Sequence, residues 1–434
     1  MQNQSHLAIN GGPAVRKEPL PLEFSGAYFY GKEELENVTQ VLKAKSPFRY
    51  YGFDLQRMTE RFERSFSRYV GSPYVLGVNS GTAALVIALT ALDVGPGDEV
   101  ILPGYLWIST VAAVVRLGAI PVLADIDESY CLDPVDMERK RTERTKAVIM
   151  VHMSGTSGRV EAIASFCRKE GIGLIEDVAQ AAGAAVGRNK LGSFGDLSIF
   201  SFQLNKTMTT GEGGAVCART RELYERAFAA HDLGYARNEA GRLDLSNLAA
   251  ATWGCGSRMS EVTAALALAQ LGKLDAICAR MRTAKWMLRE RLSTIPGLEF
   301  RSVADPAGDA GNFLMTRFPS EEDAAFYASA LRAEGIVPAS GGISNIRMTD
   351  WGLHIYYNIP GLVHKLPVSA RQSPWTDPRN AASAGICYDR GTLPKCDDLI
   401  SRTLLLCIPP SLDEPTINDI VESYRKVAAA RPLV

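Results

Sequence analysis

The stretch SIFSFQLNKTMTTGEGGAVCA, Ser198 to Ala218, places one lysine, Lys206, between two strand-like runs. The runs are LSIFSF (197–202) and GAVCA (214–218), and the turn between them is rich in glycine. A lysine would serve solubility better on a helix face than at a strand end beside bare backbone. The stretch therefore predicts two strands of a buried sheet and, between them, a turn in which Lys206 has a functional role.

Five further strand-like runs precede this stretch and alternate with helical patterns. They are VLGV (75–78), EVILP (99–103), PVLADI (121–126), AVIMVHM (147–153) and GLIED (173–177). Several of the seven runs are continuously apolar, which is typical of strands covered on both faces. The alternation predicts an α/β domain with a mostly parallel, seven-stranded sheet. Ligands of such sheets bind at the carboxyl ends of the strands.

The chain after Gly254 has a different pattern. Two amphipathic helices, with apolar faces over 259–271 and 277–288, are followed by a section with strand runs at 312–318 and 402–409. Helical patterns near 321–333 and 415–428 complete this section. We expect an N-terminal arm (1–28), a large α/β domain (29–291) and a smaller C-terminal α+β domain (292–434). The two amphipathic helices have more apolar face than a small domain can cover, which favours a homodimer.

Composition excludes several classes of protein. The 434 residues are 46% hydrophobic and 22% charged, with a net charge of −1, which argues against nucleic acid or an anionic membrane as the main partner. No apolar stretch is long enough to span a bilayer, and the N-terminus has no secretory h-region. The eight scattered cysteines predict reduced thiols in the cytoplasm. The five histidines have no H-x-x-x-H spacing, so we expect no metal centre.

Two of the strand ends carry groups suited to a phosphate and to a flat ring. The run VNSGTAAL turns into a helix at Ser80-Gly81-Thr82, where free backbone N–H groups can hold an anion such as phosphate. A plain helix cap by Ser80 is the alternative interpretation. The next strand ends in PGYLWIST, which places Trp107 at the same edge of the sheet. An aromatic residue there also fits ordinary core packing.

Two other strand ends carry charged groups. GLIEDVAQAAGA ends a strand with Glu176 and Asp177, and a buried carboxylate needs a cationic or hydrogen-bonded partner. The partner can be a protonated heterocyclic nitrogen or a residue in a structural ion pair. Ser201 and Lys206 flank the end of IFSF, and a lysine in a protected pocket can form a Schiff base, although a solvated loop lysine is the simpler alternative. Together, the four strand ends match the phosphate, ring, pyridine nitrogen and aldehyde of pyridoxal phosphate (PLP).

The order and spacing of these segments resemble a known family. SGTAAL (80–85), EDVAQAAGA (176–184), GDLSIFSF…K…TTGEGGAV and SRMSEVTAALALAQL (257–271) are similar to the DegT/DnrJ/EryC1/StrS family of PLP-dependent sugar aminotransferases. The resemblance implies the fold type I of PLP-dependent transferases. It implies that Lys206 carries the cofactor and that Asp177 binds the pyridine nitrogen. The other cofactor-binding residues that it implies are Ser80, Gly81, Thr82 and Ser201 at the phosphate, Trp107 on the ring and Gln180 near the phenolic oxygen.

The chain departs from the family pattern in WGCGSRM (253–259). Members have an asparagine that reaches the cofactor phosphate of the neighbouring subunit, and Gly256 stands at that position here. The contact between subunits that the resemblance implies is therefore in question. The resemblance otherwise favours a homodimer.

The resemblance implies amino transfer from glutamate or glutamine to a ketone. LAINGGPAVR (7–16) is similar to members that act on cyclitol ketones or make aminohydroxybenzoate, whereas DWGLHIYYNIPGL (350–362) is similar to members that aminate keto-sugars. Dehydration or aromatisation by a PLP enzyme and non-catalytic PLP binding are alternative functions. Polar and aromatic residues in expected loops are candidates to line the substrate pocket: Arg49, Tyr51, His354, Tyr356 and Tyr357.

Overall fold

The seven expected strand runs form one sheet. The computed structural model describes residues 6–433 apart from 239, 247, 249–250 and 341. The strands are β1 (Tyr74–Val78), β2 (Glu99–Pro103), β3 (Ile120–Ala124), β4 (Thr145–Val151), β5 (Gly173–Asp177), β8 (Leu197–Ser201) and β9 (Gly214–Ala218), in the order β1-β9-β8-β5-β4-β2-β3. All neighbours are parallel except β9, which runs antiparallel to both β1 and β8. The predicted mostly parallel, seven-stranded sheet is confirmed.

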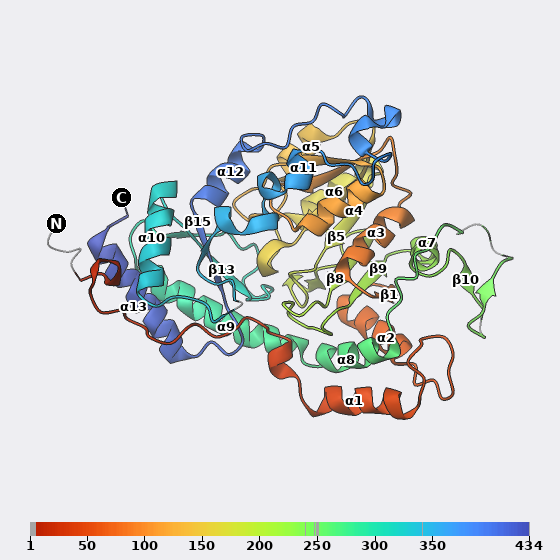
Figure 1. The fold of residues 1–434 in the computed structure, drawn as a ribbon, viewed down its shortest axis with the longest axis horizontal. Coiled ribbons are helices and arrows are strands. Elements are labelled where there is room, and N and C mark those ends of the chain that lie inside the picture. The colour runs from red at the N-terminus through yellow and green to blue at the C-terminus, as the bar shows by residue number, and fades with distance from the viewer. Residues whose placement is uncertain (1–5, 239, 247, 249–250, 341, 434) are drawn as a thin grey trace.

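Helices cover both faces of this sheet (Figure 1). They are α2 (Met58–Val70), α3 (Gly81–Ala91), α4 (Ile108–Arg116), α5 (Pro134–Lys140), α6 (Val160–Glu170), α7 (Arg221–His231) and α8 (Glu261–Leu271), and α1 (Lys32–Lys43) packs against the outside of α8. On β8, Leu197 and Ile199 pack in one core with α3, whereas Phe200 packs in another core with α2 and α8. Residues of a strand alternate between faces, so a run buried on both faces is apolar throughout.

Helix α8, the first of the two amphipathic helices whose apolar faces favoured a dimer, is covered within the chain. Helix α8 packs against α1 and α2 and buries Glu261 beside its apolar residues. Exposed apolar side chains lie elsewhere, in the α1–α2 loop and after the hairpin of β10 (Ala236–Arg237) and β11 (Leu243–Asp244). Figure 1 shows this hairpin projecting from the body of the molecule.

The C-terminal part has an antiparallel sheet of its own. Its strands are β12 (Glu299–Phe300), β13 (Phe313–Arg317), β14 (Ile346–Arg347) and β15 (Thr403–Cys407), in the order β12-β13-β15-β14. Its helices are α9 (Leu274–Leu292), α10 (Glu321–Ala333), α11 (Pro360–Val363), α12 (Pro394–Ser401) and α13 (Glu414–Ala430). Leu7 and Leu20 of the N-terminal arm pack in the core of α9, α10 and α13. The domain boundaries at 28/29 and 291/292 stay predictions.

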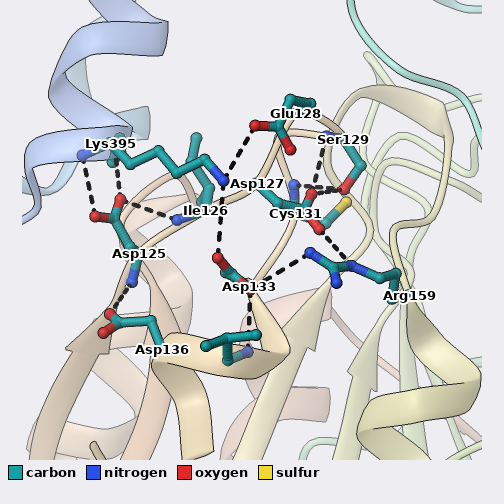
Figure 2. Close-up of polar contacts among 12 residues, drawn as sticks. Asp125, Ile126, Asp127, Glu128, Ser129, Cys131, Asp133, Asp136, Arg159 and Lys395 are labelled. Atoms are coloured by element: carbon teal, nitrogen blue, oxygen red, sulfur yellow. Dashed lines mark hydrogen bonds and ion pairs between the residues drawn. The ribbon is translucent and has the colours of Figure 1, made fainter. Parts of the chain in front are cut away.

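Helix α12 is attached to the edge of the large sheet. Asp125, directly after β3, accepts hydrogen bonds from the backbone N–H groups of Lys395 and Cys396, at 3.0 and 2.5 Å, in the first turn of α12 (Figure 2). The Lys395 ammonium lies 3.1 Å from a carboxylate oxygen of Glu128. A carboxylate at the start of a helix satisfies N–H groups that have no partner in the helix. This contact fixes the C-terminal segment against β3.

The described helices include no single one that is long and apolar enough to cross a membrane. Only α8 and α9 taken together pass such a test of length and composition, and they are bent by 51° relative to each other.

Candidate active site

A cavity of about 400 Å³ lies at the carboxyl ends of β5 and β8. Its wall brings together nine of the residues predicted from the sequence: Ser80, Gly81, Thr82, Trp107, Asp177, Gln180, Ser201, Lys206 and His354. The part of the chain that the structure describes contains no group of three or more His, Cys, Asp and Glu side chains that could hold a metal ion. The arrangement of these nine residues and their neighbours shows which ligand the cavity suits.

The start of α3 forms the first wall of the cavity. Ser80 caps the helix, because its Oγ accepts a hydrogen bond from the Ala83 N–H at 3.1 Å. Gly81 follows, and a Cβ atom there would lie 2.7 Å from the Cβ of Ser201, which is too close for any side chain. A Cβ atom on Gly214 would likewise lie 2.7 Å from the backbone carbon of Ser80. The two glycines let backbone come close at the helix start, as phosphate binding requires.

The two consecutive carboxylates at the end of β5 have different roles. Glu176 is buried and accepts hydrogen bonds from the N–H groups of Gly192, Phe194 and Gly195, at 2.7–2.8 Å. It also lies 2.9 Å from Nε2 of His152. Of the two carboxylates, Glu176 therefore has the structural role that was the alternative to cofactor binding, because its hydrogen bonds organise the loop before β8.

Asp177 faces the cavity, as the alternation of side chains along a strand requires. Its Oδ2 accepts from the Thr110 hydroxyl at 3.0 Å and its Oδ1 from the Ala179 N–H at 3.1 Å. Burial raises the pKa of Asp177, and these two hydrogen bonds and the charge of Lys206 oppose the shift. A buried carboxylate with a raised pKa is stabilised by a cation in the cavity.

Lys206 stands in the turn after β8, where its N–H donates to the Gln203 carbonyl at 2.9 Å. Among the described residues, none accepts a hydrogen bond from its amine or forms an ion pair with it. Burial lowers the pKa of Lys206, opposed by the charge of Asp177. The shift increases the fraction of uncharged amine, which is the nucleophilic form.

Aromatic rings form the wall opposite the sheet. The His354 ring stacks on Trp351 at 3.9 Å between centroids and lies 4.6 Å from Trp107. Its Nδ1 donates to the Trp351 carbonyl at 3.1 Å, so Nε2 is left to face the Gln180 amide nitrogen at 3.4 Å. Burial lowers the pKa of His354 to about 4, which keeps the ring neutral near pH 7. The sequence analysis missed Trp351 and Thr110 as residues of the site.

Four predicted substrate residues do not line this cavity. Arg49 is buried in an ion pair with Glu63 at 2.9 Å, and 64% of Tyr51 is exposed on a loop outside the cavity. Tyr356 is buried, and its hydroxyl donates to Asp397 at 2.9 Å. The Tyr357 hydroxyl is buried, has no hydrogen-bond partner among the described residues and also lies outside the cavity. Partners elsewhere in the chain hold Arg49 and Tyr356, and contact between these four residues and the substrate stays a prediction.

Gly256 lies outside the cavity, in the loop between α7 and α8. Its φ of +68° is in the left-handed region, which glycine and asparagine adopt most readily. A Cβ atom there would have no neighbour nearer than 3.8 Å, at the Arg258 guanidinium. The position therefore has room for the asparagine that the resemblance leads one to expect.

Comparison with known proteins identifies the family. The family model described as the DegT/DnrJ/EryC1/StrS aminotransferase family matches residues 30–338. The chain belongs to this family. The resemblance found in the sequence is confirmed, and the family is one of PLP-dependent aminotransferases.

Several relatives match this family member over nearly their whole length. It is 31% identical to the L-glutamine:2-deoxy-scyllo-inosose aminotransferase of Micromonospora echinospora over 98% of each chain. It is 31% identical to the dTDP-4-dehydro-2,3,6-trideoxy-D-glucose 4-aminotransferase of Saccharopolyspora spinosa, over 91% of this chain and 94% of the relative. The aminotransferase TlmJ from Streptoalloteichus hindustanus has a similar structure, with a TM-score of 0.74 and 26% identity over 95% of this chain and 98% of that one. These matches confirm the predicted fold.

Proposed function

We propose that this family member is a PLP-dependent aminotransferase that moves an amino group from glutamine or glutamate to the ketone of a keto-sugar or cyclitol. One observation carries the proposal: the unpaired amine of Lys206 and the buried carboxylate of Asp177 share a cavity with the close-packed turn at Gly81. Relatives named as aminotransferases of an inosose and of a keto-sugar support both the reaction and the two classes of acceptor.

The residues present fit PLP. The turn at Gly81 suits the phosphate because the missing side chain lets the start of α3 come close to Ser201. Asp177 suits a protonated pyridine nitrogen, since its buried carboxylate is stabilised by a cation. We assign Trp107 to the flat ring and Gln180 to its phenolic oxygen, since both residues line the cavity. When bound, PLP supplies a ring that accepts the electron pair left when the amino donor loses its Cα proton.

Lys206 has two tasks in this mechanism. Burial lowers the pKa of its amine, which increases the uncharged fraction, and this amine would hold the cofactor at its aldehyde carbon in the resting enzyme. Once the amino donor has taken that place, the free amine is the base that takes the Cα proton of the donor. In the second half-reaction the same amine returns a proton to the former ketone carbon of the acceptor. Asp177 holds the proton on the ring nitrogen throughout.

We propose a homodimer as the working unit. Phe53 and Trp253 are 90% and 98% exposed, and Leu245 and Leu248 are exposed near Trp253 in the chain. The α1–α2 loop, which carries Phe53, contacts the β10–β11 hairpin that precedes the other three, because the Arg237 guanidinium lies 4.1 Å from the centroid of the Tyr50 ring. Large exposed apolar side chains that gather on two adjoining loops are typical of an interface.

The mass in solution tests this surface. The double variant Phe53→Ser, Trp253→Ser should be monomeric where the wild type is dimeric. Leu366→Ser is the matched control, because Leu366 is an exposed apolar residue on another loop. A monomeric wild type with full activity would contradict the dimer.

The eight cysteines are all free, which supports the proposal that the enzyme works in the reducing cytoplasm.

A half-reaction experiment tests the activity. Glutamine or glutamate added to the PLP-loaded enzyme should abolish the absorbance of the lysine-bound cofactor, and a keto-sugar or cyclitol ketone should restore it. Lys206→Ala should bind PLP and show neither change. An enzyme whose spectrum responds to no amino donor would be a PLP-binding protein without this activity. Release of water from the ketone substrate without net amino transfer would indicate the dehydratase alternative.

A further inference from the structure

The side chain of Gln180, in the turn after β5, is fixed at its oxygen end. Its Oε1 accepts a hydrogen bond from the Ser154 N–H at 3.0 Å. The Gln180 carbonyl accepts from the Asn312 amide nitrogen, also at 3.0 Å, which holds the backbone of the turn. Because only the oxygen of a side-chain amide accepts, the donor at Oε1 decides which way the amide points. The NH₂ group of Gln180 is therefore directed away from Ser154.

Ser154 presents this N–H from an unusual backbone conformation. Its φ of +55° lies in the left-handed region, which residues other than glycine rarely adopt. The residue is fully buried, and its Oγ lies 2.8 Å from the Tyr105 hydroxyl oxygen. Gly155 follows with a φ of +82°, and a Cβ atom there would collide with Oδ1 of Asn312. Strained backbone persists where its surroundings hold it, and it is concentrated at functional sites, so the direction of the Ser154 N–H is a built feature of this cavity.

His354 holds the nitrogen end of the same amide. Its Nδ1 donates to the Trp351 carbonyl, so the neutral ring has its bare nitrogen at Nε2, which lies 3.4 Å from Nε2 of Gln180. The ring is neutral near pH 7 because burial lowers its pKa to about 4. Among the described residues, no other group accepts from the Gln180 NH₂. One of its two hydrogens is therefore directed to His354, and the other is left for a ligand, since Gln180 is only partly buried and lines the cavity.

The His354 ring is itself held on several sides. It stacks on Trp351 with 3.9 Å between centroids and 16° between planes, and its centroid lies 4.6 Å from that of Trp107. The Leu106 N–H donates to the His354 carbonyl at 3.0 Å, which ties the backbone of this residue to the end of β2. A group whose rotamer is locked by packing and by hydrogen bonds orients its partner more precisely than a mobile one.

We infer that His354 is a positioning residue, which accepts one hydrogen of the Gln180 amide and thereby aims the other at the phenolic oxygen of PLP. The inference rests on the proposed function, in which Gln180 is the partner of that oxygen. A hydrogen bond to the phenolic oxygen stabilises its ionised form. His354 thus acts through Gln180 on the pH at which the lysine-bound cofactor loses its proton. This places its role on the cofactor side of the site rather than on the substrate side.

His354→Phe removes the acceptor and keeps a flat ring against Trp351. The Trp351 carbonyl keeps a partner, because it also accepts the backbone N–H of residue 354 at 3.2 Å, so the fold should be retained. A weakened hydrogen bond to an ionised oxygen corresponds to a pKa shift of about one unit. We expect the absorbance midpoint of the lysine-bound cofactor in a pH titration to rise by about one unit, and the PLP dissociation constant in equilibrium dialysis to rise about tenfold.

Two further variants are controls for the acceptor. His354→Gln provides an amide oxygen that can accept near the position of Nε2, so it should keep PLP affinity within about threefold of wild type and leave the absorbance midpoint nearly unchanged. His364→Phe makes the same exchange at an exposed histidine that does not line the cavity, and it should change neither quantity. A shift in His354→Gln as large as that in His354→Phe would overturn the role of the acceptor.

Gln180→Met separates an action through Gln180 from an action on the substrate. Methionine has a similar length and no amide, so His354→Phe added to this variant should shift neither the absorbance midpoint nor the PLP affinity any further. The same shift in both backgrounds, or no shift in His354→Phe alone, would overturn the inference and leave the proposed function intact. A wild-type enzyme without the absorbance of a lysine-bound cofactor would instead overturn the proposed function, and the inference with it.

The tautomer of His354 tests the inference in the wild-type enzyme. Nitrogen NMR of the PLP-loaded enzyme with labelled histidine should show a proton on Nδ1 and a bare Nε2 near pH 7, with the His354 resonances identified by their loss in His354→Gln. A proton on Nε2 would overturn the inference, because His354 and the Gln180 NH₂ would then both be donors.

Discussion

Asp177→Asn separates the electrostatic role of the strand-end carboxylate from its structural role. The side chain accepts from the Ala179 N–H and the Thr110 hydroxyl. Asparagine can keep both contacts, because its oxygen accepts from Ala179 and its amide nitrogen can donate to the Thr110 oxygen. The variant therefore retains the geometry of the site and loses only the negative charge.

The sign of the stability change follows from the pKa. Burial raises the pKa of Asp177, so above its ordinary value near 3.8 the ionised carboxylate lowers the stability of the cofactor-free fold. Cofactor-free Asp177→Asn should consequently be at least as stable as wild type at pH 7. With PLP bound, the loss of one charge-assisted hydrogen bond to the pyridine nitrogen costs about 1.5–3 kcal/mol. That range corresponds to about a 10- to 150-fold fall in kcat/KM.

Single-turnover absorbance with glutamine, together with PLP content after dialysis, measures both effects. We expect Asp177→Asn to keep most of its cofactor and to lose most of its rate. Glu176→Gln is the control, because Glu176 accepts from the backbone of the 192–195 loop on the other side of the strand. It should lower the thermal midpoint and leave the rate of the folded fraction close to that of wild type. Near-normal turnover by Asp177→Asn would refute the electron-sink role of Asp177.

Three other changes test the phosphate turn, the subunit contact and the acid stability. Gly81→Ala should lower PLP affinity at least tenfold, because the added Cβ meets Ser201 at 2.7 Å. The control Gly95→Ala, whose added Cβ has no neighbour within 4 Å, should leave PLP affinity unchanged. Equal PLP affinities of the two variants in equilibrium dialysis would show that the phosphate lies elsewhere. Gly256→Asn should raise PLP affinity of the dimer about tenfold if one charge-assisted hydrogen bond is restored, and an unchanged affinity would contradict the contact between subunits. Burial lowers the pKa of His231 to about 3, so on acidification the unfolded chain binds the His231 proton before the folded chain does, and the free energy of unfolding falls as pH drops below 6.5. Urea melts should show about 2 kcal/mol less free energy of unfolding from this group at pH 5, and His231→Asn should lack this loss. Parallel pH profiles of stability for wild type and variant would contradict the prediction.

The strands could be predicted because burial on both faces leaves a direct mark on the sequence. The alternation of Ile199 and Phe200 between two cores requires apolar residues at successive positions of β8. The direction and order of the strands do not affect this apolar pattern, so they could not be predicted from it. Strand β9 runs antiparallel between β1 and β8, and nothing in GAVCA distinguishes this from a parallel strand. Period-two alternation could have assigned Glu176 and Asp177 to opposite faces.

The far wall of the site could not be predicted from local patterns. His354 ends a short 3₁₀ turn and Trp351 directly precedes that turn, so neither belongs to a helical or strand pattern, and their stacking depends on contacts with distant segments. Glu23 reaches the cavity only because Leu20 pairs with residues more than 300 positions later in the chain. Arg49 was a candidate for its chemistry, but its buried partner Glu63 comes from another element. Residues held by long-range contacts need the fold before they can be placed.

Covalent mapping of the cofactor tests the central claim most directly. Borohydride reduction of the PLP-loaded enzyme fixes the cofactor to the lysine that carries it, and peptide mapping by mass spectrometry identifies that lysine. The account predicts a single pyridoxyl group on Lys206, the one lysine among the described residues that line the cavity. A pyridoxyl group on any other lysine, or an enzyme that turns over fully as Lys206→Ala, would contradict it.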